Sequence, residues 1–206
     1  MKNLENVVSK IEGELDEKDQ IREVALKSSR AMVRLSGSIL KGMHREEDVK
    51  HLLDELRDEA SRLSSLVGDH PDLMTAGYVE NAFQEYAEVF IVLSLVREGD
   101  VPSPEQLRMN SIAYLLGLGD AVGELRRFCL DSLRKGDFQR ANAYLDMMED
   151  IFTSLMRFDY PDALVAIRRK QDVIRSLLEK TRGEVAVATS AGRLQAIGRA
   201  SCRERV

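Results

Sequence analysis

Apolar residues recur along the chain at helical spacing, and alternating strand-like patterns are nearly absent. In residues 3–43, for example, Met32, Leu35 and Ile39 fall on one face of a helix. Only residues 184–189 alternate as a short strand would. The pattern predicts an all-α protein of six or seven helices. Helices are expected over residues 3–43, 46–67, 73–97, 104–135, 138–157 and 161–182.

Helix ends are expected where capping and breaking residues interrupt this pattern. Gly68 and Pro71 predict a turn after the second helix. Ser103 and Pro104 predict an N-cap and a first helical position, so the fourth helix is expected to begin there. That helix is expected to break near Gly117, and a frayed tail is expected from residue 183 onwards.

Composition narrows the class of protein. The chain has 206 residues, 44% of them hydrophobic and 32% charged, which is typical of a folded, soluble domain. The longest apolar run, residues 89–96, is too short to cross a membrane, and the charged N-terminus has no apolar leader, so a cytoplasmic location is expected. Two cysteines fit a reducing compartment, and Cys129 is expected to be a small core residue.

The C-terminal residues 197–206, IGRASCRERV, can be back-translated into a common sequencing adapter. We interpret them as read-through of that adapter and exclude them from the fold. The expected organisation is therefore one helical domain over residues 1–187, a disordered tail over 188–196 and this artefact over 197–206.

Two acids stand out in the stretch AYLLGLGDAVGELRRF, residues 113–128. Asp120 and Glu124 lie one turn apart on one helix face, beside glycines that leave room for an ion or a phosphate. The plainer interpretation is a surface network in which Arg127 pairs with Glu124 and with Asp131. A dinucleotide-binding glycine loop is disfavoured, because that fingerprint requires a preceding strand.

A second acid pair, Glu85 and Glu88, precedes an apolar run on the same helix face. Ionised carboxylates in such a place need a cation or a raised pKa, and packing against a basic residue of another helix is the alternative. If the two acid pairs converge, four carboxylates would suit a hard divalent cation, which prefers oxygen ligands.

The first helix carries a basic stripe opposite its apolar face. The stripe is either a solvated surface or a set of sequence-independent phosphate contacts. Its members are Lys27, Arg30, Arg34, Lys41 and Arg45.

Three segments together resemble the translin superfamily, and more closely its translin-associated factor X branch, in an archaeal-type form. They are the long first helix, QEYAEVF at residues 84–90, and the family pattern Y-L-L-G-x-x-D-x-x-G-E-L-x-R. The resemblance covers about residues 21–187. The residues that match the pattern are Tyr114, Leu115, Leu116, Gly117, Asp120, Gly123, Glu124, Leu125 and Arg127.

The resemblance implies a translin-like bundle of antiparallel helices that assembles into a closed homo-oligomer, a hexamer or an octamer. It further implies a Mg²⁺-dependent endoribonuclease, with Mn²⁺ as a substitute metal, acting on single-stranded RNA. Single-stranded DNA is a further expected ligand. Glu85, Glu88, Asp120 and Glu124 match the acids that bind the metal and catalyse the reaction in the factor X branch.

Nucleic-acid contacts are expected at Lys27, Arg30, Arg34, Lys41 and Arg127. The stretch TAGYVENAF, residues 75–83, lacks the basic cluster that translin has there, which moves the expected phosphate contacts to the first helix. Two alternatives remain open at this point. One is a non-catalytic protein that binds single-stranded RNA or DNA, and the other is a purely structural helical oligomer.

Overall fold

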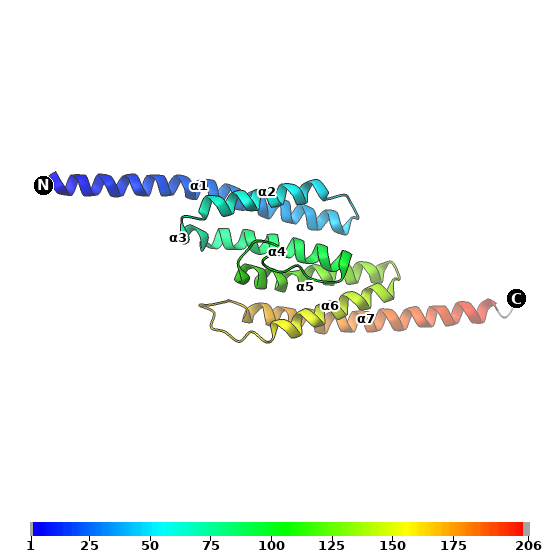
Figure 1. Ribbon diagram of the computed structural model, residues 1–206. Helices are drawn as coiled ribbons and strands as arrows, with labels where there is room; N and C mark the ends of the chain where they lie inside the picture. The colour runs from blue at the N-terminus through cyan, green and yellow to red at the C-terminus, as the bar shows by residue number, and fades with distance from the viewer. Residues whose placement is uncertain (1, 204–206) are drawn as a thin grey trace. The chain divides into compact units, whose positions relative to one another are not determined.

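The computed structural model describes the backbone of residues 2–203 and the side chains of residues 3–192 (Figure 1). Over this range the chain has seven helices and no strand. This confirms the all-α class and the larger of the two predicted numbers of helices. The helices are α1 (Lys2–His44), α2 (Lys50–Val67), α3 (Pro71–Met74), α4 (Gly77–Glu98), α5 (Ser111–Arg134), α6 (Phe138–Leu155) and α7 (Arg168–Arg203).

The helices group into two compact units, and the single domain expected over residues 1–187 stays a prediction. The first is Met1–Val89, with α1, α2, α3 and the first half of α4. The second is Phe90–Val206, with the rest of α4 and α5, α6 and α7.

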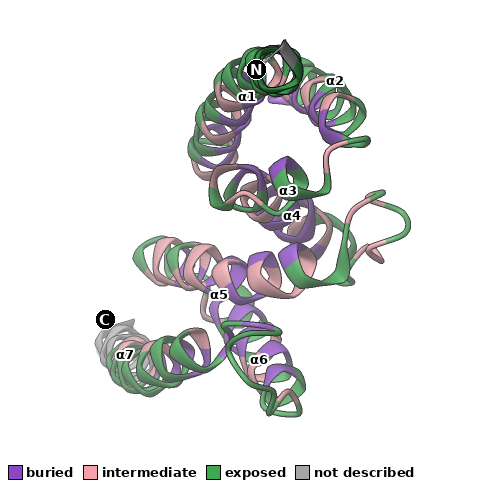
Figure 2. Ribbon diagram, turned by 90° about the vertical axis from the view of Figure 1, so that its left-hand side faces the viewer, coloured by how far each residue is buried: buried purple, intermediate pink, exposed green. Residues whose placement is uncertain are grey.

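In the first unit α1 and α2 form an antiparallel hairpin. Buried positions run along one side of each helix and exposed positions along the other (Figure 2). Met32 and Ile39 of α1 and Leu56 of α2 are completely buried, as their spacing predicts. At the hairpin end, a Cβ on Gly42 would lie 2.5 Å from Val49 Cγ1, so only glycine permits this close approach.

In the first part of α1, none of the described side chains from residue 3 to residue 24 is buried. This part nevertheless carries apolar side chains at helical spacing, each between 44% and 60% exposed. These are Leu4, Val7, Val8, Ile11 and Leu15.

In the second unit α5, α6 and α7 pack against one another in pairs. The α5–α6 turn is made by Gly136, whose φ of +75° favours glycine, and by Asp137, whose side chain accepts a hydrogen bond from Arg140 N at 3.0 Å. The core between these helices includes the fully buried residues Leu125, Cys129, Met148, Leu155, Ile174 and Leu178. The expectation that Cys129 is a core residue is therefore confirmed.

The expected start of the fourth helix is wrong. Ser103 does form a reciprocal cap with Gln106, with hydrogen bonds of 2.7 and 3.3 Å, but only a turn follows. Arg108 then takes a φ of +53°, which interrupts the helical path. The helix α5 begins at Ser111, where the side chain of Asn110 accepts a hydrogen bond from Ala113 N at 2.8 Å. It continues unbroken past Gly117.

The other boundaries differ less. A single helical turn, α3, replaces part of the expected turn around Pro71. The last helix begins at Arg168 instead of residue 161, and it continues to Arg203, well beyond the end predicted near residue 182. The side chains of the expected adapter segment, residues 197–206, lie outside the described residues.

Candidate functional site

The α5 acid pair, Asp120 and Glu124, lies on one face of α5 as the spacing predicts. The two side chains are 31% and 15% exposed, so both are partly withdrawn from water. Partly buried carboxylates need hydrogen-bond donors or a cation, because desolvation disfavours their charged form.

Each of these acids contacts a basic side chain. Arg127 Nη1 donates to both oxygens of Glu124, at 3.0 and 2.9 Å, which is the pair that the spacing on one helix predicts. Lys170 Nζ, from the first turn of α7, donates to Asp120 Oδ1. Sequence reasoning missed Lys170, because a residue fifty positions away on another helix leaves no mark in the spacing.

A groove of about 400 Å³ opens beside Asp120 between α5 and α7. We call it the Lys170 groove. Its polar members are Asp120, Arg169 and Lys170, and its other walls are small or aliphatic. The complete lining is Gly119, Asp120, Gly123, Ala166, Arg169, Lys170, Val173, Ile174 and Leu177.

Two glycines of α5 shape this groove. A Cβ on Gly119 would lie 3.1 Å from Cδ of Lys170, so the lysine stem crosses α5 where a side chain is missing. A Cβ on Gly123 would meet nothing within 4 Å, so the space above it belongs to the groove. The room beside the acids that the sequence suggests is therefore present, and the stem of Lys170 occupies part of it.

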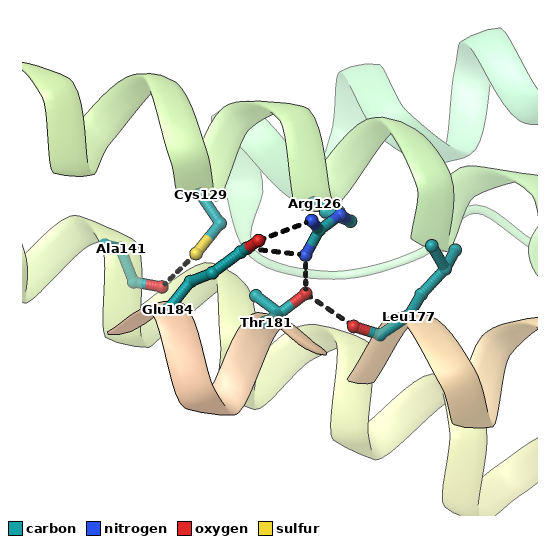
Figure 3. Close-up of polar contacts among 6 residues, drawn as sticks. All are labelled: Arg126, Cys129, Ala141, Leu177, Thr181 and Glu184. Atoms are coloured by element: carbon teal, nitrogen blue, oxygen red, sulfur yellow. Dashed lines mark hydrogen bonds and ion pairs between the residues drawn. The ribbon is translucent and has the colours of Figure 1, made fainter. Parts of the chain in front are cut away.

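Less than two turns along α5, a second cluster joins the same two helices (Figure 3). Arg126 donates to Thr181 Oγ1 at 2.5 Å and to the two oxygens of Glu184 at 3.0 and 2.8 Å. Thr181 in turn donates to the carbonyl of Leu177 at 2.7 Å. We call Arg126, Thr181 and Glu184 the Arg126 cluster. The sequence gives no signal for it, since Arg126 lies between residues of the family pattern.

The buried thiol of Cys129 lies beside this cluster and donates to the carbonyl of Ala141 at 3.3 Å (Figure 3). Burial raises the pKa of Cys129 to about 11, which outweighs the opposite effect of the nearby Arg126 charge. A thiol of this kind stays protonated near neutral pH and is a structural residue.

The α4 acid pair, Glu85 and Glu88, belongs to the first compact unit. Glu88 is only 9% exposed and Glu85 is partly buried, and the residues that follow, Val89 to Leu93, are buried as well. The helix therefore carries a buried carboxylate at Glu88, directly before a run of buried apolar residues.

The two acid pairs lie in different units, and their meeting at one point stays a prediction. Within the part of the chain that the structure describes, no group of three or more His, Cys, Asp or Glu side chains is arranged to hold a metal ion. Glu85 and Glu88 lie in the first unit, and Asp120 and Glu124 lie in the second.

The basic stripe of α1 lies on the surface, opposite the buried Met32 and Ile39. Arg45 pairs with Glu47 at 3.7 Å. Among the residues described, no carboxylate pairs with the other four members, Lys27, Arg30, Arg34 and Lys41. We call these four the α1 cations. Unpaired surface cations are available to bind an anionic partner.

The sequence from residue 16 to residue 183 matches the model of the translin family. The chain belongs to the translin family. An uncharacterised protein of Methanocaldococcus jannaschii is 33% identical over 175 residues, which cover 83% of this chain and 78% of that protein. The family pattern that contains Asp120 and Glu124 therefore lies within the matched region.

Solved structures agree with this translin-family fold. The crystal structure of AfC3PO is 30% identical, with a TM-score of 0.82 over 89% of this chain and 97% of that one. The structure of AfC3PO in complex with duplex RNA has a TM-score of 0.76 over the same shares at the same identity. The crystal structure of apo-NeC3PO, 23% identical over 88% of this chain and 96% of that one, has the same fold at a TM-score of 0.80.

None of the described helices is both long enough and apolar enough to span a membrane.

Proposed function

We propose that this translin-family chain is a subunit of a closed homo-oligomer, a hexamer or an octamer, that binds single-stranded RNA and cleaves it with Mg²⁺. The observation that carries RNA binding is the set of α1 cations, which are exposed and have no carboxylate partner in the described chain. A structural relative that is 30% identical, AfC3PO, was solved in complex with duplex RNA, which supports binding of RNA in general.

The α1 cations suit an extended phosphate backbone. From Lys27 to Lys41 a helix advances about 21 Å, at a rise of roughly 1.5 Å per residue. Such a row can contact several phosphates of one strand without reading the bases. Because the chain is acidic overall, with a net charge of −5, this local stripe decides where an anion approaches.

We propose cleavage because this chain has all four acids that match the nuclease branch of the family, that of translin-associated factor X. The donor chemistry fits the metal, since Mg²⁺ is usually held by one or two carboxylates together with several waters. Glu85, Glu88, Asp120 and Glu124 would hold the ion, or Mn²⁺ in its place. A bound Mg²⁺ supplies charge stabilisation at the phosphoryl oxygen and a more acidic water.

In this proposal Arg127 and Lys170, the basic partners of the α5 acid pair, neutralise the acids before RNA binds, and Arg127 then contacts the RNA. Arg127 is 56% exposed, so its guanidinium can leave Glu124 and contact a phosphate instead. Until then, Arg127 and Lys170 offset the charges of Glu124 and Asp120.

The alternative is a non-catalytic RNA- or DNA-binding protein. It is favoured by the fact that Asp120 and Glu124 already have basic partners, as acids with a purely structural role would. This alternative predicts salt-sensitive binding that is indifferent to Mg²⁺ and gives no cleavage product.

The test is single-turnover cleavage of a single-stranded RNA by the chain without residues 197–206, with and without Mg²⁺. Glu124→Gln should slow cleavage by more than the roughly 10–100-fold that loss of an outer metal partner costs. Glu179→Gln is the matched control, because Glu179 is an exposed glutamate on α7 outside the proposed site. Equal rates for native protein and Glu124→Gln would remove the catalytic role and leave the alternative.

RNA binding is tested separately from cleavage. Lys27→Gln and Arg34→Gln should each weaken binding, and each should reduce the slope of log affinity against log salt by about 0.7. Native protein that binds no RNA at low salt would remove the proposed function entirely. Light scattering on the same samples reports the oligomer.

A further inference from the structure

The Lys170 groove contains two basic residues that sequence analysis did not identify. Arg169 is exposed, and among the residues described no carboxylate pairs with it. Lys170 is more enclosed, with its side chain 22% exposed and its ammonium at Asp120. Two basic groups and one acidic group give the groove a net positive charge in a chain that is acidic overall.

The position of Lys170 is fixed at both ends of its side chain. Its stem lies across Gly119, where the missing Cβ leaves just enough room. Its ammonium is held by Asp120 at the wall of the groove. A lysine confined in this way loses less conformational entropy on binding an anion than a free surface lysine does.

The ammonium of Lys170 can serve two anions at once. It has three N–H donors, and a contact with one oxygen of Asp120 uses one of them. The remaining donors and the five N–H groups of Arg169 are available to phosphate oxygens. Arg169 and Lys170 are consecutive residues of α7, and both line the groove.

We propose that the Lys170 groove is a second backbone-contact site for RNA, in which Arg169 and Lys170 together bind one phosphodiester group. The inference rests on the proposed RNA-binding function and adds a contact in the second unit to that of the α1 cations. Asp120 acts here as the positioning residue of Lys170. The aliphatic walls, Val173 and Leu177 among them, can contact the ribose beside the phosphate.

The experiment measures the affinity of the full oligomeric protein for one short single-stranded RNA at several salt concentrations, without Mg²⁺ so that no cleavage occurs. Arg169→Gln and Lys170→Gln are compared with Lys180→Gln, an exposed lysine on the same helix outside the groove. Each groove variant should weaken binding about tenfold, the effect of one lost charge-assisted hydrogen bond. Each should also lower the salt slope by about 0.7, whereas Lys180→Gln should leave both quantities unchanged.

Folding is checked by the melting temperature of each variant. Arg169→Gln is the variant that should fold as the native protein does, because among the described residues no acid contacts Arg169 and its loss should not disturb α7. If both groove variants keep the native RNA affinity and the native salt slope, the proposal that the groove binds RNA is wrong. If Lys27→Gln and Arg34→Gln weaken binding at the same time, the proposed RNA-binding function survives that result.

A second arm titrates inorganic phosphate against the bound RNA. If the groove recognises the RNA backbone, the RNA should bind far more tightly than inorganic phosphate does. Displacement of the RNA at equal concentrations of inorganic phosphate would mean that the groove is a simple anion site, and would overturn the proposal. Failure of the native protein to bind RNA would overturn the groove and the proposed function together.

Discussion

Two ion pairs join α5 and α7: in one the basic residue is on α5, and in the other it is on α7. The two pairs differ in how many of the basic groups' N–H donors are bonded within the protein. In the Arg126 cluster the basic group lies on α5, is 17% exposed, and donates to both Thr181 and Glu184. In the Lys170 groove the basic group lies on α7, and beside it Arg169 has no carboxylate partner in the described chain. The donors of Arg126 are therefore bonded within the protein, whereas the Lys170 groove has donors that can bind a ligand. We call the Arg126 cluster closed and the Lys170 groove open in this sense.

This difference separates a structural contact from a binding surface within one helix pair. Hydrogen bonds that are satisfied inside the protein stabilise the fold and leave nothing to offer a ligand. Donors that line a groove of about 400 Å³ contribute little to the fold but can bind an anion. The following predictions test whether stability and binding divide in this way.

The largest effect is expected at Cys129, beside the closed cluster. Because its pKa is raised from 9.0 to about 11, the folded protein should contain roughly a hundredfold less thiolate than the unfolded chain below pH 9. A thiol reagent at pH 8 should therefore modify native Cys129 at least about a hundredfold more slowly than in denaturant. The measurement uses a Cys202→Ser background, and equal rates would show that this end of the helix pair is open.

The same shift has a consequence for pH dependence. A raised thiol pKa means that the folded state keeps its proton while the unfolded state loses it. The contribution to stability is therefore complete below about pH 9 and declines as the pH rises to about 11. Comparing Cys129→Ala with the Cys202→Ser parent in denaturant titrations across that range isolates the contribution, and parallel curves would contradict it.

Arg126→Met should lower the free energy of unfolding by about 2 kcal/mol, because it removes hydrogen bonds made by a partly buried charge. RNA affinity should stay at the native value. Arg134→Met is the matched control, since Arg134 is 82% exposed in its pair with Asp131 and should change stability by less than about 0.5 kcal/mol. A loss of RNA binding in Arg126→Met without a loss of stability would show that the Arg126 cluster binds RNA and is not a structural contact.

The two groove glycines should respond differently to alanine. Gly123→Ala should raise the free energy of unfolding by about 0.5–1 kcal/mol, through helix propensity alone, since the new Cβ meets open space. Gly119→Ala should raise the free energy of unfolding by less, because the new Cβ would lie 3.1 Å from Cδ of Lys170, which is closer than an ordinary contact. Denaturant unfolding of both variants decides this, and equal gains would mean that the stem is free to move.

Lys170→Met should have the smallest effect on folding, within about 0.5 kcal/mol of native. The aliphatic stem is kept, and Asp120 at 31% exposure can turn to water. Chemical denaturation gives the value. A loss comparable to that of Arg126→Met would show that the groove is as closed as the cluster.

Much of the fold could be predicted from the sequence, because helical periodicity is a local signal. The spacing of Met32 and Ile39 identified the buried face of α1, and the break between the expected helices 104–135 and 138–157 coincides with the α5–α6 turn. The start of α5 was missed because Ser103 has real capping chemistry and only the positive φ of Arg108 stops the helix after it. That backbone conformation is not encoded by any single residue type.

The candidate site was predictable only in part. Asp120, Glu124 and Arg127 lie on one helix, so their spacing alone placed them together. Lys170, Arg169 and the partners of Arg126 come from α7, and their positions depend on how two helices pack. The role of Gly119 likewise depends on helix packing, because it is the stem of Lys170 from α7 that crosses it.

The exposed apolar side chains at the start of α1 have a consequence for dynamics. An isolated helical segment of about 20 residues is only marginally stable in water. None of the described side chains from residue 3 to residue 24 is buried, so backbone amides there should exchange with deuterium within seconds in the isolated subunit. The amides around Met32 and Ile39 should be protected for far longer, and the midpoint of α1 should appear as a sharp step in the exchange profile.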